Sequence, residues 1–246
     1  MGTKGIFITV RTGSTRLPNK PILKIKEKYT IEYVIDSVKS SKYADLVVLC
    51  TTTRKEDLVL CDIARNNNIE YFQGSEHNKW ERWRHACEKF DIDFFVNADG
   101  DDLFYDAGLA DICFKQHLNN PKKRVVIDGQ GLYNDVYGFD RAAINKICSL
   151  EGSDQTEPHH LIEFLRYTDI KVDKILNIPD LYKKNNLRMT LDYPEDLQFF
   201  KTIIESFKDS GFTLEDVINY TNLNPQVREI NYFREEAWKE NQKAAK

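Results

Sequence analysis

The chain has 246 residues, of which 41% are hydrophobic and 30% are charged, and its formal net charge at pH 7 is −4. This composition is typical of an ordinary globular protein and excludes the basic excess of a general nucleic-acid binder. We therefore expect no nucleic-acid partner, and any site for an anion must come from a local group of cations.

Cysteine usage and hydrophobic runs indicate the cellular compartment. The five cysteines are widely spaced and form no C-x-x-C pair, which favours buried thiols in a reducing compartment over a zinc site. No apolar run approaches the roughly 20 residues that span a bilayer, and the first residues lack the apolar stretch of a signal peptide. We expect a cytoplasmic protein without a membrane partner.

Short β-branched or aromatic runs alternate with helical patterns through the first half of the chain. The runs predict strands at residues 5–10, 46–51, 69–72, 93–97 and 124–127. Apolar residues three or four positions apart predict helices at 30–41, 55–67, 79–90 and 106–118. Several strands are apolar at successive positions, as expected when helices cover both faces of a sheet. The pattern predicts an α/β fold with right-handed βαβ units and a three-layer, mostly parallel, Rossmann-like sheet.

The alternation weakens after residue 128. The segment DGQGLYNDVYGFD is rich in turn-forming residues, and SLEGSDQTEPHHLIEFLRYTDIKVDKI leads from a loop into a helix and a strand. We interpret residues 128–180 as a small insertion in a single domain that covers residues 1–246. From Pro194 onward the pattern predicts a helix, a loop, a short helix and a polar, frayed end.

The first predicted strand leads into a cationic loop, at the edge where open parallel sheets bind ligands. Backbone N–H groups near Gly13 and the hydroxyls of Ser14 and Thr15 can surround a phosphate, while Arg16 and Lys20 neutralise its charge. Neither the G-x-x-x-x-G-K-[ST] nor the G-x-G-x-x-G phosphate motif is present. The alternative is a solvated basic loop.

Acidic residues follow another predicted strand. Asp99, Asp101 and Asp102 surround Gly100, and such crowded carboxylates repel one another unless a cation lies between them. Mg²⁺ suits this position, because it takes one or two carboxylates together with phosphate oxygens. The alternative is an Asp-rich turn in which Asp106 caps the next helix.

A further aspartate occupies a comparable position later in the chain. Asp192 follows the strand-like residues 187–191 and precedes Pro194, Glu195 and Asp196, which are typical of a helix start. We treat Glu195 and Asp196 as structural, and Asp192 as the candidate for a second metal ligand.

Three segments, in chain order, resemble the motifs of one enzyme family. VRTGSTRLPNKPIL resembles A-R-x-G-S-T-R-[LF]-P-G-K-x-L. FQGSEHNKWERWRHACEKFDIDFFVNADGDDLFYD resembles G-S-E-x-x-x-x-x-R-[YF] followed by G-D-x-P-L-I-D, and LRMTLDYPEDLQFF resembles L-R-x-T-[LV]-D-x-P-E-D-L-x-F. These motifs are typical of the cytidylyltransferases that include CMP-Kdo synthetase, CMP-acylneuraminate synthetase and the spore-coat polysaccharide enzymes. The resemblance implies a sheet of the nucleotide-diphospho-sugar transferase type.

The resemblance also implies an activity and its residues. The enzyme would transfer CMP from CTP to an acidic sugar or other small acceptor, with release of pyrophosphate, for surface polysaccharide synthesis. The expected catalytic residues are Arg16, Lys20, Asp101 and Asp192, with the two aspartates as ligands of Mg²⁺. The expected nucleotide-binding residues are Arg11, Gly13, Ser14, Thr15, Arg16, Lys20, Gly74, Ser75, Arg82 and Asp99. The chain departs from the motifs at Val10, Asn19 and Leu103, where the family has alanine, glycine and proline.

The acceptor stays open between an acidic sugar, a phosphorylated alcohol and a phosphonate. The candidate acceptor residues are Tyr137, Glu157, His159, His160, Arg166 and Arg188. One alternative is an enzyme of the same fold that uses another NTP, and a second is a non-catalytic nucleotide-binding relative. The second is disfavoured because binding alone does not demand paired metal carboxylates. The resemblance further implies a homodimer, for which residues 157–172 are a candidate interface segment.

Overall fold

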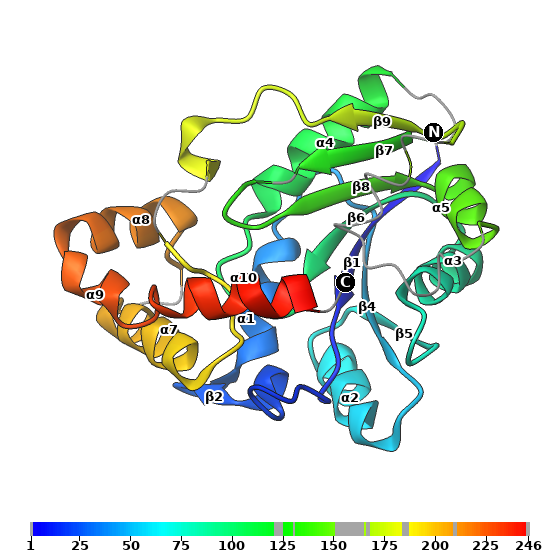
Figure 1. The fold of residues 1–246 in the computed structure, drawn as a ribbon. Coiled ribbons are helices and arrows are strands. Elements are labelled where there is room, and N and C mark those ends of the chain that lie inside the picture. Colours follow the sequence, from blue (N-terminus) through cyan, green and yellow to red (C-terminus); the bar gives the residue numbers. More distant parts are fainter. Residues whose placement is uncertain are drawn as a thin grey trace.

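The computed structural model of the chain describes residues 2–120, 125–129, 131–150, 165, 168–183, 187–208 and 211–244. The strands of its main sheet are β1 (Thr3–Thr9), β4 (Leu46–Thr52), β5 (Glu70–Gly74), β6 (Ile92–Asp99), β7 (Val125–Gly129), β8 (Val136–Asp140) and β9 (Lys171–Lys174). Their order is β5-β4-β1-β6-β8-β7-β9, and neighbours run parallel except at β8, which is antiparallel to β6 and β7 (Figure 1). The short strands β2 (Lys24–Ile25) and β3 (Lys28–Tyr29) form a separate antiparallel pair.

Helices cover both faces of this sheet. In chain order the α-helices are α1 (Thr30–Val38), α2 (Leu58–Asn66), α3 (Lys79–Phe90), α4 (Ala107–Asn119), α5 (Arg141–Cys148), α7 (Pro194–Ser206), α8 (Leu214–Leu223), α9 (Pro225–Glu229) and α10 (Arg234–Ala244). Short 3-10 turns lie at η1 (Lys20–Ile22), η2 (Lys55–Asp57) and η4 (Asp180–Tyr182).

Two hydrophobic clusters, one on each face, explain why the strands are apolar at successive positions. In β1, Ile6 and Ile8 join the cluster that contains residues of α1, α2 and α4, whereas Phe7 joins the cluster of α3 and α5. All three side chains are fully buried, and each such burial contributes about 1.5–3 kcal/mol. The helix–sheet–helix layering confirms the predicted α/β fold.

The predicted elements of the first half agree with the structure, with ends shifted by up to three residues; the helix expected at 30–41, for example, covers Thr30–Val38. The segment that we interpreted as turn-rich contains β8, which the sequence reasoning missed. Its central Gly138 weakens the strand pattern, yet a Cβ there would lie 2.5 Å from the ring of Phe94. The close approach of that ring therefore requires glycine inside a strand.

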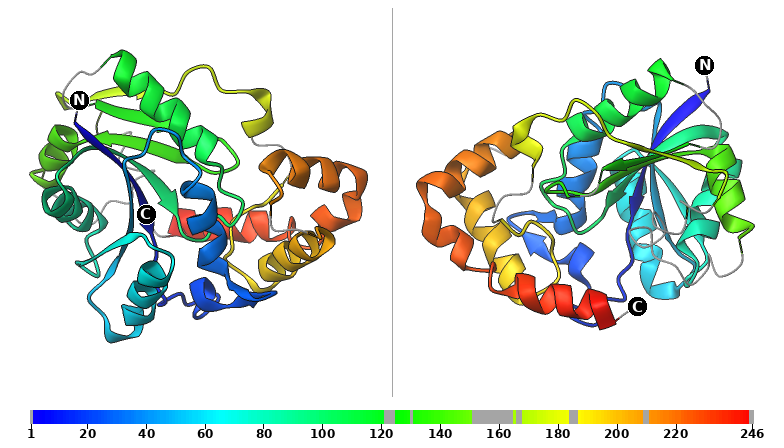
Figure 2. Two further views of the ribbon diagram at one scale, coloured as in Figure 1. Left: turned by 180° about the vertical axis from the view of Figure 1, so that it is seen from behind. Right: turned by 45° about the horizontal axis from the view of Figure 1, so that its top comes forward.

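The second half is more helical than expected. After Pro194, α7, α8 and α9 gather at one side of the sheet, and α10 runs back from them (Figures 1 and 2). Helix α10 lies in the polar end, of which only the last few residues were predicted to be frayed. The described parts of residues 128–180 supply β8, α5 and β9 to the main sheet and its helical layer. Among the described residues, no helix has the length and apolar character needed to cross a membrane.

Candidate active site

Three loops meet at the carboxyl edge of the sheet. Residues 10–20 follow β1, residues 100–106 follow β6, and residues 187–193 lead into α7. The backbone N–H of Leu191 donates to the carbonyl oxygen of Asp101 at 2.9 Å, which joins the second loop to the third. Side chains from all three loops converge where open parallel sheets bind their ligands.

Lys20 lies between two carboxylates from distant parts of the chain. Its Nζ is 2.5 Å from Oδ2 of Asp101 and 3.0 Å from Oδ1 of Asp192. Nη2 of Arg16 is 2.6 Å from the same oxygen of Asp192. The side chain of Asp192 is 3% exposed and that of Lys20 is 15% exposed. The structure thus brings together, in one partly buried cluster, the four residues that the family motifs mark as catalytic.

Burial and charge act in opposite directions on this cluster. Burial disfavours the ammonium of Lys20, but the Asp101 and Asp192 carboxylates outweigh it and raise the pKa of Lys20. Burial likewise disfavours the Asp192 carboxylate, but Lys20 and Arg16 lower its pKa. For Asp101, burial raises the pKa, and the nearby Asp192 and Asp99 carboxylates add to this against the effect of Lys20. Lys20 therefore stays protonated at neutral pH and holds the two aspartates together.

The two aspartates fit a divalent cation. Oδ2 of Asp101 and Oδ1 of Asp192 approach one nitrogen atom, so the two oxygens converge on one point. Mg²⁺ in nucleotide sites takes one or two carboxylates and completes its shell with phosphate oxygens and water. Within the described ranges, no group of three or more His, Cys, Asp or Glu side chains is arranged to hold a metal ion. The rest of the shell of a cation at this point would come from water or from the phosphates of a bound nucleotide.

Asp57 holds the loop after β1 in shape. Its Oδ1 accepts hydrogen bonds from the backbone N–H and the hydroxyl of Thr12, at 2.8 and 2.7 Å, and its Oδ2 accepts one from the hydroxyl of Thr52. Burial of Asp57 raises its pKa, but these hydrogen bonds outweigh that effect and lower it. The predicted phosphate-binding residues of the loop stay open to solvent: Arg11, Gly13 and Thr15 are exposed, and Ser14 is partly exposed.

A family model described as cytidylyltransferase matches residues 6–239. This chain belongs to the cytidylyltransferase family. It is 23% identical over 229 residues to the spore coat polysaccharide biosynthesis protein SpsF of Bacillus subtilis, covering 90% of this chain and 95% of SpsF. The structure of a cytidylyltransferase from Leptospira borgpetersenii has a TM-score of 0.80 at 24% identity, covering 92% of this chain and 97% of that one.

A second solved structure is a CMP:2-keto-3-deoxy-manno-octonic acid synthetase complexed with CTP. It has a TM-score of 0.63 at 13% identity and covers 83% of this chain and 99% of its own. Both structural likenesses show the fold, and the family match shows a nucleotidyltransferase enzyme. The resemblance drawn from the three sequence motifs is confirmed at the level of the family.

The departures of this cytidylyltransferase from its family motifs leave the loop conformations possible. Asn19, in place of glycine, has a φ of 58°, in the left-handed region that asparagine adopts more readily than most residues. Leu103, in place of proline, is the second residue of a turn closed by a 2.8 Å hydrogen bond from the N–H of Tyr105 to the carbonyl of Asp102. Proline is favoured at that position of a turn. The exchanged residues therefore suit the same backbone.

Arg82, which we predicted to contact the nucleotide, lies beneath the turn of Gly74 and Ser75. Its side chain is buried beneath the loop after β5, where Nη1 donates to the carbonyl oxygen of Ser75 at 2.7 Å. A Cβ on Gly74 would lie 2.9 Å from Cγ of Arg82, so glycine is needed for this close packing. Arg82 therefore supports the Gly74–Ser75 turn from inside.

Asp99 has a partner that the sequence reasoning missed. Its Oδ1 is 3.3 Å from Nζ of Lys79, the first residue of α3, and the same ammonium lies 4.9 Å from the ring centroid of Trp83. The only sequence signal for Lys79 is its place at the start of a predicted helix. This pair balances the charge of Asp99 without using Lys20.

The predicted acceptor residues fall into two groups. Four lie outside the described residues: Glu157, His159, His160 and Arg166. The other two are buried. Tyr137 is 3% exposed and its ring packs near that of Phe139. The side chain of Arg188 is 2% exposed, and carboxylates surround its guanidinium.

A buried amide near the same edge was not predicted. Asn134 lies in the turn between β7 and β8 and is 1% exposed. Neither polar atom of its side chain has a hydrogen-bond partner in the part of the chain that the structure describes. The backbone N–H of Tyr137 donates to Oδ1 of Asn97 at 2.7 Å, which places the start of β8 beside the last part of β6. Leaving such a group unpaired costs about 1–3 kcal/mol, which a ligand with a polar group would recover.

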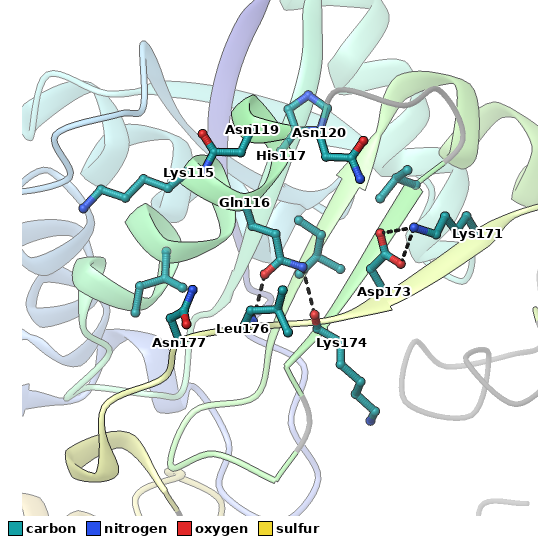
Figure 3. Close-up of a pocket in the computed structure, with 13 residues that line it drawn as sticks. Lys115, Gln116, His117, Asn119, Asn120, Lys171, Asp173, Lys174, Leu176 and Asn177 are labelled. Atoms are coloured by element: carbon teal, nitrogen blue, oxygen red, sulfur yellow. Dashed lines mark hydrogen bonds and ion pairs between the residues drawn. The ribbon is translucent and has the colours of Figure 1, made fainter.

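A cavity of about 600 Å³ lies between α4 and β9, and none of the cluster residues lines it (Figure 3). Two of its lysines pair with carboxylates, since Lys171 is 2.7 Å from Asp173 and Lys174 is 2.5 Å from Asp128, and Nζ of Lys115 lies 5.3 Å from the ring centroid of Tyr43. The side-chain amide of Gln116 bridges α4 to the backbone after β9 (Figure 3). We therefore assign the chemistry to the Lys20 cluster and not to this cavity.

Proposed function

We propose that this cytidylyltransferase uses CTP and transfers CMP to an acidic sugar or another small acceptor, with release of pyrophosphate, for surface polysaccharide synthesis. The observation that carries the proposal is the position of Lys20, whose ammonium joins Asp101 and Asp192 beside Arg16. Cations and carboxylates at one point suit a ligand that brings phosphates and a divalent cation together. The names of SpsF and of the CTP-bound synthetase support the choice of nucleotide and of a sugar-related acceptor.

In the proposed reaction an acceptor oxygen attacks the α-phosphorus of CTP. A P–O bond to the acceptor forms, and the bond to the β-phosphate oxygen breaks with its electron pair leaving on pyrophosphate. A hydroxyl acceptor loses its proton to water or to a base. Arg16 and Lys20 neutralise charge on the phosphates, and the N–H groups of the loop after β1 orient them. Mg²⁺ held by Asp101 and Asp192 would neutralise further charge and lower the pKa of an acceptor hydroxyl.

The test measures pyrophosphate release with CTP, UTP, GTP and ATP in the presence of Mg²⁺, against a panel of acidic sugars, sugar phosphates and phosphonates. We expect release with CTP alone, and only with an acceptor. Asp101→Asn should lower the rate at least 100-fold, as expected when charge-stabilising groups are lost. Asp45→Asn is the matched control, because Asp45 pairs with Lys4 at 2.7 Å on the surface, with half of its side chain exposed.

Two outcomes would contradict the proposal. Release with another NTP in place of CTP would reassign the substrate, while CTP binding without turnover across the panel would favour a non-catalytic relative.

The homodimer is a separate proposal. Light scattering should give twice the 28.8 kDa mass of one chain, and a mass of one chain would exclude it.

A further inference from the structure

The two carboxylate oxygens of Asp192 have different partners. Oδ1 faces the cluster, where Arg16 and Lys20 lie at 2.6 and 3.0 Å. Oδ2 is 3.2 Å from Nη2 of Arg188, on the other side of the carboxylate. The side chains of Asp192 and Arg188 are 3% and 2% exposed, so water does not replace this contact. Arg188 therefore restrains Asp192 from behind and leaves Oδ1 to face the ligand.

Arg188 is itself held in one orientation by Asp196. Nε and Nη2 of Arg188 lie 2.9 and 3.2 Å from the two oxygens of the Asp196 carboxylate, a forked pairing that a lysine does not reproduce. Oδ2 of Asp196 also accepts hydrogen bonds from the backbone N–H groups of Asp192 and Tyr193, both at 2.9 Å. One carboxylate thus fixes the guanidinium and the backbone that carries Asp192.

The C-terminal segment completes this support. Glu235 of α10 lies 3.4 Å from Nη1 of Arg188. The side-chain amide of Asn231, just before α10, donates to the carbonyl oxygen of Arg188 at 3.0 Å and to Asp196 at 2.9 Å. Side chains about 40 positions after Asp192 in the sequence thereby reach the back of the site.

We propose that Arg188 is a positioning residue for Asp192, and that Glu235 anchors Arg188 from the C-terminal helix. The proposal rests on the proposed function, in which Oδ1 of Asp192 binds the divalent cation of the nucleotide complex. Groups behind a ligating side chain fix its orientation, and their removal typically weakens metal binding 10–100-fold. Arg188 touches neither substrate nor metal in this role.

The decisive comparison is Arg188→Lys against Arg234→Lys in the full chain. Arg234 makes a forked pair with Glu195, at 3.1 and 2.7 Å, that joins α10 to α7 in a more exposed position, and among the described residues it makes no hydrogen bond or ion pair with Asp192. Both variants keep their charge and lose a fork. The readout is Mn²⁺ affinity in the presence of CTP, measured by electron paramagnetic resonance, together with the Mg²⁺ concentration for half-maximal pyrophosphate release.

We expect Arg188→Lys to bind Mn²⁺ about 10–100-fold more weakly than wild type, and to recover much of its turnover at high Mg²⁺. Arg234→Lys should bind Mn²⁺ like wild type. Glu235→Gln leaves Arg188 in place and removes only its 3.4 Å contact with Glu235, so it should weaken Mn²⁺ binding by less than Arg188→Lys does. If Arg188→Lys does not fold, the Mn²⁺ affinity of Glu235→Gln tests the positioning role of Arg188 instead.

Equal Mn²⁺ affinity in wild type, Arg188→Lys and Arg234→Lys, whatever their thermal stabilities, would show a purely structural ion pair and overturn the positioning role. If Arg188→Lys is unfolded, wild-type affinity in Glu235→Gln overturns it. A wild-type protein that binds no Mn²⁺ with CTP would instead remove the proposed function, and the positioning role with it. The two failures are therefore distinguishable.

Discussion

Replacement of Lys20 by methionine tests the charge arrangement of the site. The substitution keeps a long apolar stem but removes the ammonium that lies 2.5 and 3.0 Å from Asp101 and Asp192. The two carboxylates then face each other with Arg16 as the remaining cation at Asp192. We expect Lys20→Met to be less stable than wild type when divalent cations are absent, and to release no pyrophosphate.

The magnitude follows from burial. Removal of one partner of a buried ion pair costs about 3–5 kcal/mol, and the lower value applies because Arg16 stays. For a chain of this length each 1 kcal/mol lowers Tm by about 2–4 °C, so we expect a loss of about 6–12 °C. Lys28→Met is the matched control, since Lys28 lies at the same 2.5 Å from Asp36 but both side chains are more than one-third exposed. Its loss should stay below about 4 °C, because exposed pairs contribute at most about 1 kcal/mol.

Thermal unfolding with and without Mg²⁺ completes this test. In Lys20→Met the two aspartates have lost their shared cation, so Mg²⁺ should bind there and raise Tm more than it does in wild type. At ten times its Kd the ion contributes about 1.4 kcal/mol. The reasoning would be refuted if Lys20→Met lost no more Tm than Lys28→Met does. It would also be refuted if Mg²⁺ raised the Tm of Lys20→Met and of wild type equally.

Three further changes test other parts of the structure. Asp57→Asn should lower the free energy of unfolding by about 1–3 kcal/mol at pH 7 in urea titrations, because the amide cannot accept every hydrogen bond of the carboxylate. Since the pKa of Asp57 is lowered on folding, its contribution should be complete above its unfolded pKa near 3.9 and vanish as pH falls through the folded pKa; a difference that is constant down to pH 2 would contradict this. Gly100→Ala should destabilise the protein, because a Cβ would lie 2.7 Å from Cβ of Val10, and Val10→Gly, which removes that Cβ, should couple favourably with it in a double-mutant cycle; simple additivity would argue against the contact. Asn134→Leu should raise the KM for the acceptor about tenfold without changing that for CTP, and should not lower Tm, since it removes an unpaired buried amide; an unchanged acceptor KM would exclude the contact.

The fold of the first half was predictable because each element there carries a strong local pattern. Strands such as β1 are buried on both faces and read as continuous apolar runs, and helices such as α3 show apolar residues at helical spacing. The local sequence pattern does not predict an element whose secondary structure depends on tertiary contacts. Gly138 is needed inside β8 by the ring of Phe94, and α10 is a polar sequence whose Arg234 and Glu235 pair with residues far away in the chain.

The residue types of the site were predictable from the sequence, but the buried residues that hold them in place were not. Lys20 and Asp101 lie in the loops after β1 and β6, so their convergence at one sheet edge follows from parallel topology. The strand-like residues 187–191 form no strand, and a hydrogen bond from the N–H of Leu191 to the carbonyl oxygen of Asp101 brings the segment of Asp192 to the same edge. Asp57 and Arg188 are different, because a charged residue normally indicates a surface position. Their burial depends on partners supplied by other segments, such as Thr12 for Asp57 and Asp196 for Arg188, and no local spacing reveals such pairing.

The pairing of Lys20 with both aspartates has a consequence for how ligands enter. The family motifs assign Lys20 to phosphates and the aspartates to a metal ion, yet in the structure these groups bind one another. A phosphate alone would draw Lys20 away and leave two carboxylates unpaired in a partly buried site, while a cation alone would have to displace the ammonium. Phosphate and cation together replace both lost interactions at once. We therefore expect CTP and Mg²⁺ to strengthen each other's binding reciprocally, and Lys20→Met to weaken that coupling, because its aspartates accept a cation without nucleotide.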